Sequence, residues 1–213
     1  ARQAQPGQFV HVRVCEGYNP LLRRPFSIHR VKSRKIEIIY KVVGKGTNML
    51  SRKKNGEYLD VLGPLGTGYR SPSPTAKISD VILVAGGIGV ASLLFLAESL
   101  SVTSSELSIL AIIGAKDKDE LLCEGDFKRL GCRVEIATEN GTKGYRGLAS
   151  DLFQECLPLS SDIVKPLVFA CGPLGMLKNV GEISKKRHFP CQVSLEENLA
   201  CGVGACLGCV VKV

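Results

Sequence analysis

The sequence has little of what marks a nucleic-acid-binding, membrane or secreted protein. It contains no tryptophan and only 6% aromatic residues, and no basic run has aromatics interleaved, so we expect no nucleic-acid partner. No apolar run approaches the roughly 20 residues that span a bilayer, and residues 1–7 lack the apolar centre of a signal peptide. We therefore expect a cytoplasmic protein with no membrane partner. The net charge of +8 is attributed to ordinary surface and phosphate-cofactor binding, with an acidic protein partner as an alternative.

Cysteine is abundant, in contrast to these absences. The 213 residues include nine cysteines, an odd and high number. A disulfide framework is not expected in a chain of this size without a secretory signal. Six cysteines are scattered, whereas Cys201, Cys206 and Cys209 crowd the end of the sequence. The crowded three indicate a metal site.

The first third of the chain has the pattern of β-structure. Apolar residues alternate with polar ones, and glycine-containing turns separate the runs. No helix fits before residue 70, apart from a turn or two around residues 47–54. Several short strands with turns between them predict a small antiparallel β-barrel. The expected strands are residues 9–14, 25–31, 35–43 and 58–62.

After a linker at residues 70–75, strands and helices alternate and predict a doubly wound parallel sheet. The run at residues 81–85 is continuously apolar, as expected of a strand buried on both faces. The other expected strands are 107–113, 133–138 and 167–170, with helices at 90–100, 120–130, 147–157 and 174–187. We expect three parts: a barrel at 1–70, an α/β domain at 76–190 and a cysteine-rich segment at 191–213.

The three crowded cysteines follow the spacing C-x4-C-x2-C, which is that of three of the four ligands in plant-type [2Fe–2S] proteins. Interspersed glycines supply the backbone freedom that a tightly wound ligand loop needs. A zinc site usually shows paired C-x2-C units, so zinc is an alternative, as are thiols without a metal. A fourth ligand is expected beyond Val213, since Cys171 or Cys191 would break the usual order.

Three other segments carry weaker signals. A glycine turn at residues 86–89 follows a buried strand and begins a helix, so its main-chain amides are suited to bind a pyrophosphate. The alternative is a turn with no ligand. Residues 171–173 (CGP) follow another buried strand. Cys171 is either a functional residue or simply a small buried side chain of the core. Residues 22–27 (LRRPFS) contain arginines that can neutralise a phosphate and a serine, Ser27, that can hydrogen-bond a heterocycle. The alternative is a structural Arg–carboxylate pair.

Together these pieces resemble the ferredoxin–NADP reductase superfamily, and within it the electron-transfer subunits of dihydroorotate dehydrogenase B. Such proteins join an FAD-binding β-barrel to a nicotinamide-binding α/β domain. The matching segments are residues 6–9 (PGQF), 23–28 (RRPFSI), 61–66 (VLGPLG), 86–90 (GGIGV) and 194–197 (SLEE), which leads into the cysteine loop.

The resemblance implies roles for individual residues. FAD would be held by Arg24, Pro25, Phe26, Ser27, Ile39, Tyr40, Lys41, Gly46 and Thr47, with Arg24 and Gly46–Thr47 at the pyrophosphate. NAD would be held by Gly86, Gly87 and Gly89, with Cys171, Gly172 and Pro173 at the nicotinamide ring. The implied catalytic residues are Ser27 near the flavin N5, Cys171, and Glu196 at the flavin edge. The cluster would be bound by Cys201, Cys206 and Cys209.

The implied function is electron transfer in pyrimidine biosynthesis. Electrons would pass between an FMN-containing catalytic subunit and NAD through the [2Fe–2S] cluster and FAD, within a hetero-oligomer. The cofactors would carry the redox chemistry, and the protein would position them. One alternative is a related reductase subunit that serves a hydrogenase, a sulfite reductase or an oxygenase. Another is a zinc- and nucleotide-binding protein without redox activity.

The sequence also departs from the pattern of the superfamily. Ala91 and Ser92 follow the glycine turn where a proline is usual, and an N-terminal barrel strand is expected to be missing. The choice between NAD and NADP stays open: Lys116 is placed to meet a 2′-phosphate, or is simply solvated.

Overall fold

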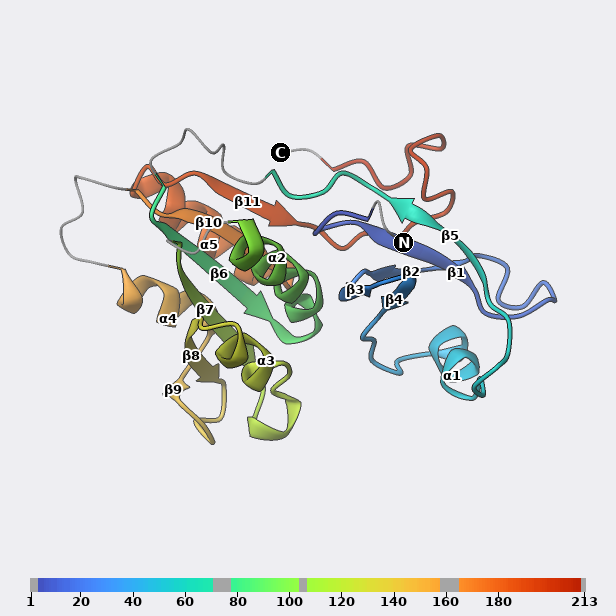
Figure 1. The fold of residues 1–213 in the computed structure, drawn as a ribbon, viewed down its shortest axis with the longest axis horizontal. Helices are drawn as coiled ribbons and strands as arrows, with labels where there is room; N and C mark the ends of the chain where they lie inside the picture. The colour runs from blue at the N-terminus through green and yellow to red at the C-terminus, as the bar shows by residue number, and fades with distance from the viewer. Residues whose placement is uncertain (1–3, 71–77, 104–106, 158–164, 212–213) are drawn as a thin grey trace.

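The computed structural model describes residues 4–70, 78–103, 107–157 and 165–211. It contains a part made of antiparallel strands and a part built on a six-stranded parallel sheet, side by side in Figure 1. Most of the predicted linker, residues 71–75, lies outside the described residues. No helix among the described residues is long and apolar enough to cross a membrane.

The first part holds a three-stranded antiparallel sheet and a separate hairpin. The sheet has the order β2–β1–β5, with β1 (Phe9–Arg13) between β2 (Arg24–Ser27) and β5 (Asp60–Leu65). The hairpin pairs β3 (Arg30–Lys32) with β4 (Lys35–Glu37), and α1 (Lys45–Ser51) follows. A small core is formed by Val10, Val12, Val14, Phe26, Ile28 and Leu50.

Two of the predicted strands differ from the structure. The run at 25–31 is two strands, β2 and β3, rather than one. The expected strand at 35–43 ends at Glu37, although Ile38 and Tyr40 still pack against the small core. Alternation of apolar and polar residues indicates which side chains face a core, whereas a strand also needs a hydrogen-bonded partner. The alternation therefore continues beyond the last residue that pairs with β3. The closed barrel stays a prediction.

The second part confirms the predicted parallel sheet. Its strand order is β11–β10–β6–β7–β8–β9, and each neighbouring pair is parallel. The strands are β6 (Asp80–Gly86), β7 (Ser108–Ala115), β8 (Arg133–Thr138), β9 (Tyr145–Arg146), β10 (Leu167–Cys171) and β11 (Cys191–Ser194). The helices are α2 (Val90–Thr103), α3 (Glu124–Arg129), α4 (Ala149–Cys156) and α5 (Leu174–Lys186), with short 3₁₀ helices at Gly87–Gly89 and Lys118–Glu120.

Each face of this sheet is covered by helices. Val81, Leu83 and Ala85 of β6 lie in a core with side chains of α2 and α3, whereas Ile82 and Val84 lie in a second core with those of α4 and α5. The continuous apolar run is therefore buried on both faces, as predicted. β9 and β11 were not predicted, because they are short and their side chains are half-buried or exposed. β11 joins the sheet within the segment that the sequence assigned to the cluster.

Candidate functional site

The two predicted nucleotide segments meet at one point of the sheet. β6 lies between β7, the next strand along the chain, and β10, a much later one, so the strand order reverses between β6 and β10. Parallel sheets bind ligands in the crevice at the carboxyl ends of strands on either side of such a reversal. Residues 86–89 follow β6, and residues 171–173 lie at the carboxyl end of β10.

These two segments are so close that only glycine fits. A Cβ on Gly89 would lie 2.2 Å from the carbonyl oxygen of Cys171. A Cβ on Gly172 would lie 2.9 Å from the Cα of Gly86, and one on Gly86 would lie 2.7 Å from the Cδ of Pro173. Gly89 and Gly172 therefore pack against backbone of the other segment, and Gly86 packs against the ring of Pro173. The structure brings together the residues that the sequence assigned to the nicotinamide cofactor.

Cys171 lies in a buried polar group at the carboxyl end of β10. Burial raises the pKa of its thiol, and the nearby charge of Glu196 raises it further. The hydroxyls of Ser92 and Tyr69 are 3.2 Å apart, and both contact Cys171. A thiol with a raised pKa stays protonated, so Cys171 is suited to lining a ring rather than to attacking one. The sequence analysis missed Tyr69 and did not give Ser92 a role.

Glu196 lies just beyond the end of β11 and is exposed. Ser194, two residues before Glu196, pairs with Cys171 in the β10–β11 ladder, and the charge of Glu196 contributes to the raised pKa of the thiol. Ser27 lies apart from them in sequence, half-buried at the end of β2 and paired with Phe9 of β1.

The predicted FAD segment forms a second candidate site. Arg23 is held by Asp60, donating through Nη1 to the carbonyl oxygen at 2.9 Å and pairing with the carboxylate. Arg24 forms no ion pair with any of the described residues; its side chain covers Gly46, where a Cβ would lie 2.8 Å from Nε. The guanidinium of Arg24 is therefore the better placed of the two to meet an anion beside Gly46.

Other predicted FAD residues surround this point. Phe26 is buried against Tyr40, with ring centroids 5.3 Å apart, and Pro25 is exposed on β2. The Thr47 hydroxyl accepts hydrogen bonds from the amides of Val43 and Gly44, at 3.0 and 3.1 Å. A cavity of about 590 Å³ adjoins α1, but none of the predicted FAD residues lines it. Its lining residues are Val42, Gly44, Lys45, Asn48, Met49 and Arg52.

Lys41 forms an ion pair with the other part of the molecule, and its role at FAD stays a prediction. Its ammonium pairs with the carboxylate of Glu120 at 2.7 Å, which links the antiparallel part to the parallel-sheet part. Ile39, beside Tyr40, is half-buried.

The cysteine loop lies against the antiparallel sheet. In Figure 1 the red C-terminal segment leaves β11 and returns toward β5. The amide of Cys206 donates to Cys201 Sγ at 3.5 Å. This and the amides of Val203 and Ala205 lower the pKa of Cys201 to about 6, so its sulfur is a thiolate near neutral pH. A thiolate held by main-chain amides is the form in which cysteine binds iron.

The structure does not bring all three predicted ligands together. Across residues 4–70, 78–103, 107–157 and 165–211, no group of three His, Cys, Asp or Glu side chains is close enough to hold a metal ion. Cys201 and Cys206 are adjacent, and the loop rests on His11 of β1, whose Nδ1 would be 2.5 Å from a Cβ on Gly202. His11 was missed because its neighbours Val10 and Val12 carry the alternating pattern. The three-cysteine site stays a prediction.

Comparison with known proteins identifies the family. The chain is 41% identical over its whole length to the dihydroorotate dehydrogenase B (NAD(+)) electron transfer subunit of Desulforamulus reducens, of which it covers 79%. It is 40% identical to the same subunit of Geobacillus kaustophilus, over 98% of this chain and 78% of that one. The chain belongs to the family of dihydroorotate dehydrogenase B electron transfer subunits. No protein-family model matches it.

Solved structures of ferredoxin–NADP reductases share the fold of this chain. The chain superimposes on the structure of an NADH-dependent reduced ferredoxin–NADP oxidoreductase with a TM-score of 0.80 and 30% identity, covering 98% of this chain and 72% of that one. A ferredoxin NADP+ reductase from Neisseria gonorrhoeae with bound FAD and NADP shares the fold, with a TM-score of 0.70 at 14% identity, over 90% of this chain and 87% of that one.

Proposed function

We propose that the chain is the electron transfer subunit of an NAD-linked dihydroorotate dehydrogenase B. It passes electrons between a catalytic subunit and NAD(+) through FAD and an iron–sulfur cluster. The observation that carries this proposal is the contact between residues 86–89 and 171–173, in a chain 41% identical over its length to a named electron transfer subunit. The alternative of a reductase subunit for another enzyme has no observation of its own in the described residues.

The nicotinamide dinucleotide is proposed to bind where the two glycine-rich segments meet. Main-chain amides of Gly87 and Gly89 lie at the start of α2, where they are suited to a pyrophosphate. Cys171, with Gly172 and Pro173, would line the nicotinamide ring. The protonated thiol of Cys171 would contact the ring without exchanging a proton with it, and Glu196, which is exposed, would lie at the flavin edge.

FAD is proposed to bind along β2 and the start of α1. Arg24 would neutralise the pyrophosphate beside Gly46 and Thr47, while Tyr40 and Ser27 would contact the flavin. FAD, when bound, couples two-electron exchange with a nicotinamide to one-electron exchange with an iron–sulfur cluster. We propose that the antiparallel strands form the FAD-binding barrel, as in the family resemblance.

A [2Fe–2S] cluster is proposed at Cys201, Cys206 and Cys209. The support is chemical: the thiols follow the spacing C-x4-C-x2-C, and main-chain amides lower the pKa of Cys201, which favours the thiolate. All nine cysteines are free, which fits a cytoplasmic, reducing location. We propose the division into residues 1–70, 76–190 and 191–213, with β11 joining the last segment to the sheet.

The test uses the complex with its catalytic subunit. The two proteins, purified separately and mixed under argon, are expected to reduce NAD(+) when dihydroorotate is added, and neither protein does so alone. Flavin and iron are assayed in each sample, so that an unloaded protein is not mistaken for an inactive one. Oxidation of dihydroorotate by this chain alone, or no NAD(+) reduction by a fully loaded mixture, would contradict the proposal.

A further inference from the structure

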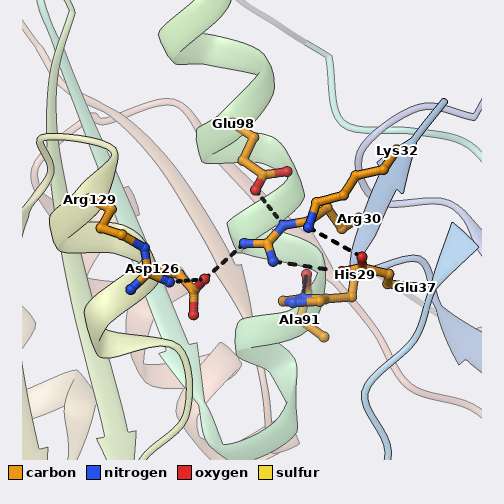
Figure 2. A network of polar contacts seen from close by, with 8 residues as sticks. All are labelled: His29, Arg30, Lys32, Glu37, Ala91, Glu98, Asp126 and Arg129. Carbon is orange, nitrogen blue, oxygen red and sulfur yellow. Dashed lines mark hydrogen bonds and ion pairs between the residues drawn. The ribbon is translucent and has the colours of Figure 1, made fainter.

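His29 and Arg30 form a connection between the two parts of the molecule, which we name the His29–Arg30 clamp. Figure 2 shows Arg30 of β3 pointing between Glu98 of α2 and Asp126 of α3. Arg30 Nε donates to Glu98 Oε1 at 2.5 Å, and Nη2 donates to Asp126 Oδ1 at 3.0 Å. A single guanidinium thus joins the antiparallel part to two helices of the parallel-sheet part.

The Arg30 contacts are shielded from water. The side chain of Arg30 is 15% exposed, and those of Glu98 and Asp126 are 27% and 26% exposed. Arg30 also lies 3.6 Å from Glu37 of its own hairpin, and Asp126 is shared with Arg129 at 2.7 Å. Ion pairs screened this little are more rigid than surface pairs, and the planar fork of arginine fixes direction as well as distance.

His29 makes the second contact of the clamp. Its side chain is buried, and Nδ1 lies 3.2 Å from the carbonyl oxygen of Ala91 in the first turn of α2. Because a carbonyl only accepts, Nδ1 carries the proton and donates. From Ala91 to Glu98 is seven residues, or about 10 Å along the helix. Contacts at two points this far apart prevent α2 from both sliding and tilting against β3.

The clamp lies next to both proposed cofactor segments. His29 follows Ser27, the end of the FAD strand, by two residues. Ala91 follows Gly89, the end of the glycine turn, by two residues as well. The contact between His29 and Ala91 therefore joins the FAD strand to the nicotinamide turn through two residues of chain on each side.

We propose that His29 and Arg30 are positioning residues that set how closely the nicotinamide approaches the flavin. The proposal rests on the proposed function. The affected step is hydride transfer: a C–H bond of the reduced nicotinamide breaks, an N–H bond forms on the flavin, and two electrons move with the hydride. Rates of such steps depend steeply on approach, so a misplacement of about 1 Å costs on the order of 100-fold.

The test compares R30Q with the wild type and with K32Q. Lys32 lies on the same hairpin, pairs with Glu37 and is exposed, so K32Q removes one positive charge without touching α2 or α3. Stopped-flow absorbance under argon measures flavin reduction by NADH. R30Q is expected to slow reduction at saturating NADH by roughly 10- to 100-fold, with FAD content and NAD(+) affinity near wild type. K32Q is expected to keep the wild-type rate.

Two readouts besides rate separate positioning from general damage. The long-wavelength charge-transfer absorbance of the nicotinamide–flavin complex is expected to weaken in R30Q. Hydrogen exchange is expected to quicken in the first turns of α2 and not in β7. R30K keeps the positive charge but lacks the planar guanidinium that contacts two partners, so its rate is expected to lie between those of R30Q and the wild type. E98Q removes the negative charge of one partner of Arg30, so it serves as the second variant if R30Q does not fold.

The outcomes are distinct. Wild-type rate and charge-transfer absorbance in folded R30Q or E98Q would overturn the positioning role while leaving the proposed function intact. Loss of FAD or of NAD(+) affinity equal to the loss of rate would also overturn it, because binding rather than approach would then be affected. A flavin-loaded wild type that NADH does not reduce would overturn the proposed function, and the clamp proposal with it.

Discussion

The two proposed cofactor sites are built differently, and the difference shows which of them tolerates change. At the nicotinamide site a Cβ on Gly89 would meet the main-chain carbonyl of Cys171, which cannot move without moving β10. At the FAD site a Cβ on Gly46 would meet the side chain of Arg24, which is flexible. The first site depends on rigid backbone packing, and the second on a side chain that adapts.

The surrounding packing follows the same division. The parallel sheet is covered by two clusters of buried side chains, one on each face, whereas the antiparallel part has a single small cluster. Val61 on β5 and Tyr58 just before it are 46% and 97% exposed. The parallel-sheet part therefore contributes most of the stability, and the antiparallel part leaves much of its apolar surface open.

The largest expected effect is on stability. F169A removes a fully buried ring from β10 and is expected to lower the free energy of unfolding by roughly 3–5 kcal/mol. V61A, on the exposed strand β5, is expected to change it by less than about 0.5 kcal/mol. Denaturant unfolding measures both. Equal losses in the two variants would break the comparison between the two parts.

The two glycines provide the sharpest functional contrast. G89A forces main chain apart and is expected to slow flavin reduction by NADH by roughly 100-fold, with FAD content unchanged. G46A only displaces Arg24, so we expect FAD affinity to fall by about 10-fold, which corresponds to the lower end of the roughly 1.5–3 kcal/mol that one hydrogen bond to a charged group contributes. Stopped-flow kinetics and FAD titration measure these effects. A more damaging G46A would show that the FAD site is the rigid one.

The cysteine loop tests whether the metal site is separate from both nucleotide sites. C201S removes the thiolate that the main-chain amides stabilise and is expected to abolish bound iron while flavin content stays at the wild-type level. C15S is the matched control, because Cys15 lies in a loop of the antiparallel part. Iron, sulfide and flavin assays give the result. Unchanged iron in C201S would remove the loop from the cluster proposal.

The smallest expected effect is a pH dependence at the connection between the two parts. Burial lowers the pKa of His29 below its usual 6.5, so the folded chain binds the proton only at a lower pH than the unfolded chain does. Below about pH 6.5 the unfolded chain binds more protons, and the free energy of unfolding falls as pH falls. H29Q is expected to reduce this slope and K32Q to keep it, measured by denaturant unfolding at several pH values. A wild-type slope in H29Q would contradict this account.

The order of strands and helices in the parallel sheet could be predicted from the sequence, because long apolar runs and glycine turns report burial directly. The short strands β9 and β11 could not, since two to four half-exposed residues leave no periodic signal. The predicted strand at residues 35–43 is longer than the observed one, because alternation indicates which side chains face the core and not which residues pair with a neighbouring strand.

For the candidate site too, the sequence indicates some positions and not others. Residues 86–89 and 171–173 could be predicted because each directly follows a buried strand, and the sheet brings such ends together. His29 and Arg30 could not, because their partners Ala91, Glu98 and Asp126 lie more than 60 residues away in sequence. Contacts of that kind depend on how the two parts are packed, which no local pattern encodes.

The central claim is that this chain moves electrons between a nicotinamide and a flavin. The most direct measurement is the visible absorption spectrum of the purified chain under argon, before and after addition of NADH, with FAD and iron assayed in the same sample. The account predicts flavin bands that bleach on addition of NADH. A protein that takes up no FAD on reconstitution, or that holds FAD but keeps its bands unchanged with NADH, would contradict it.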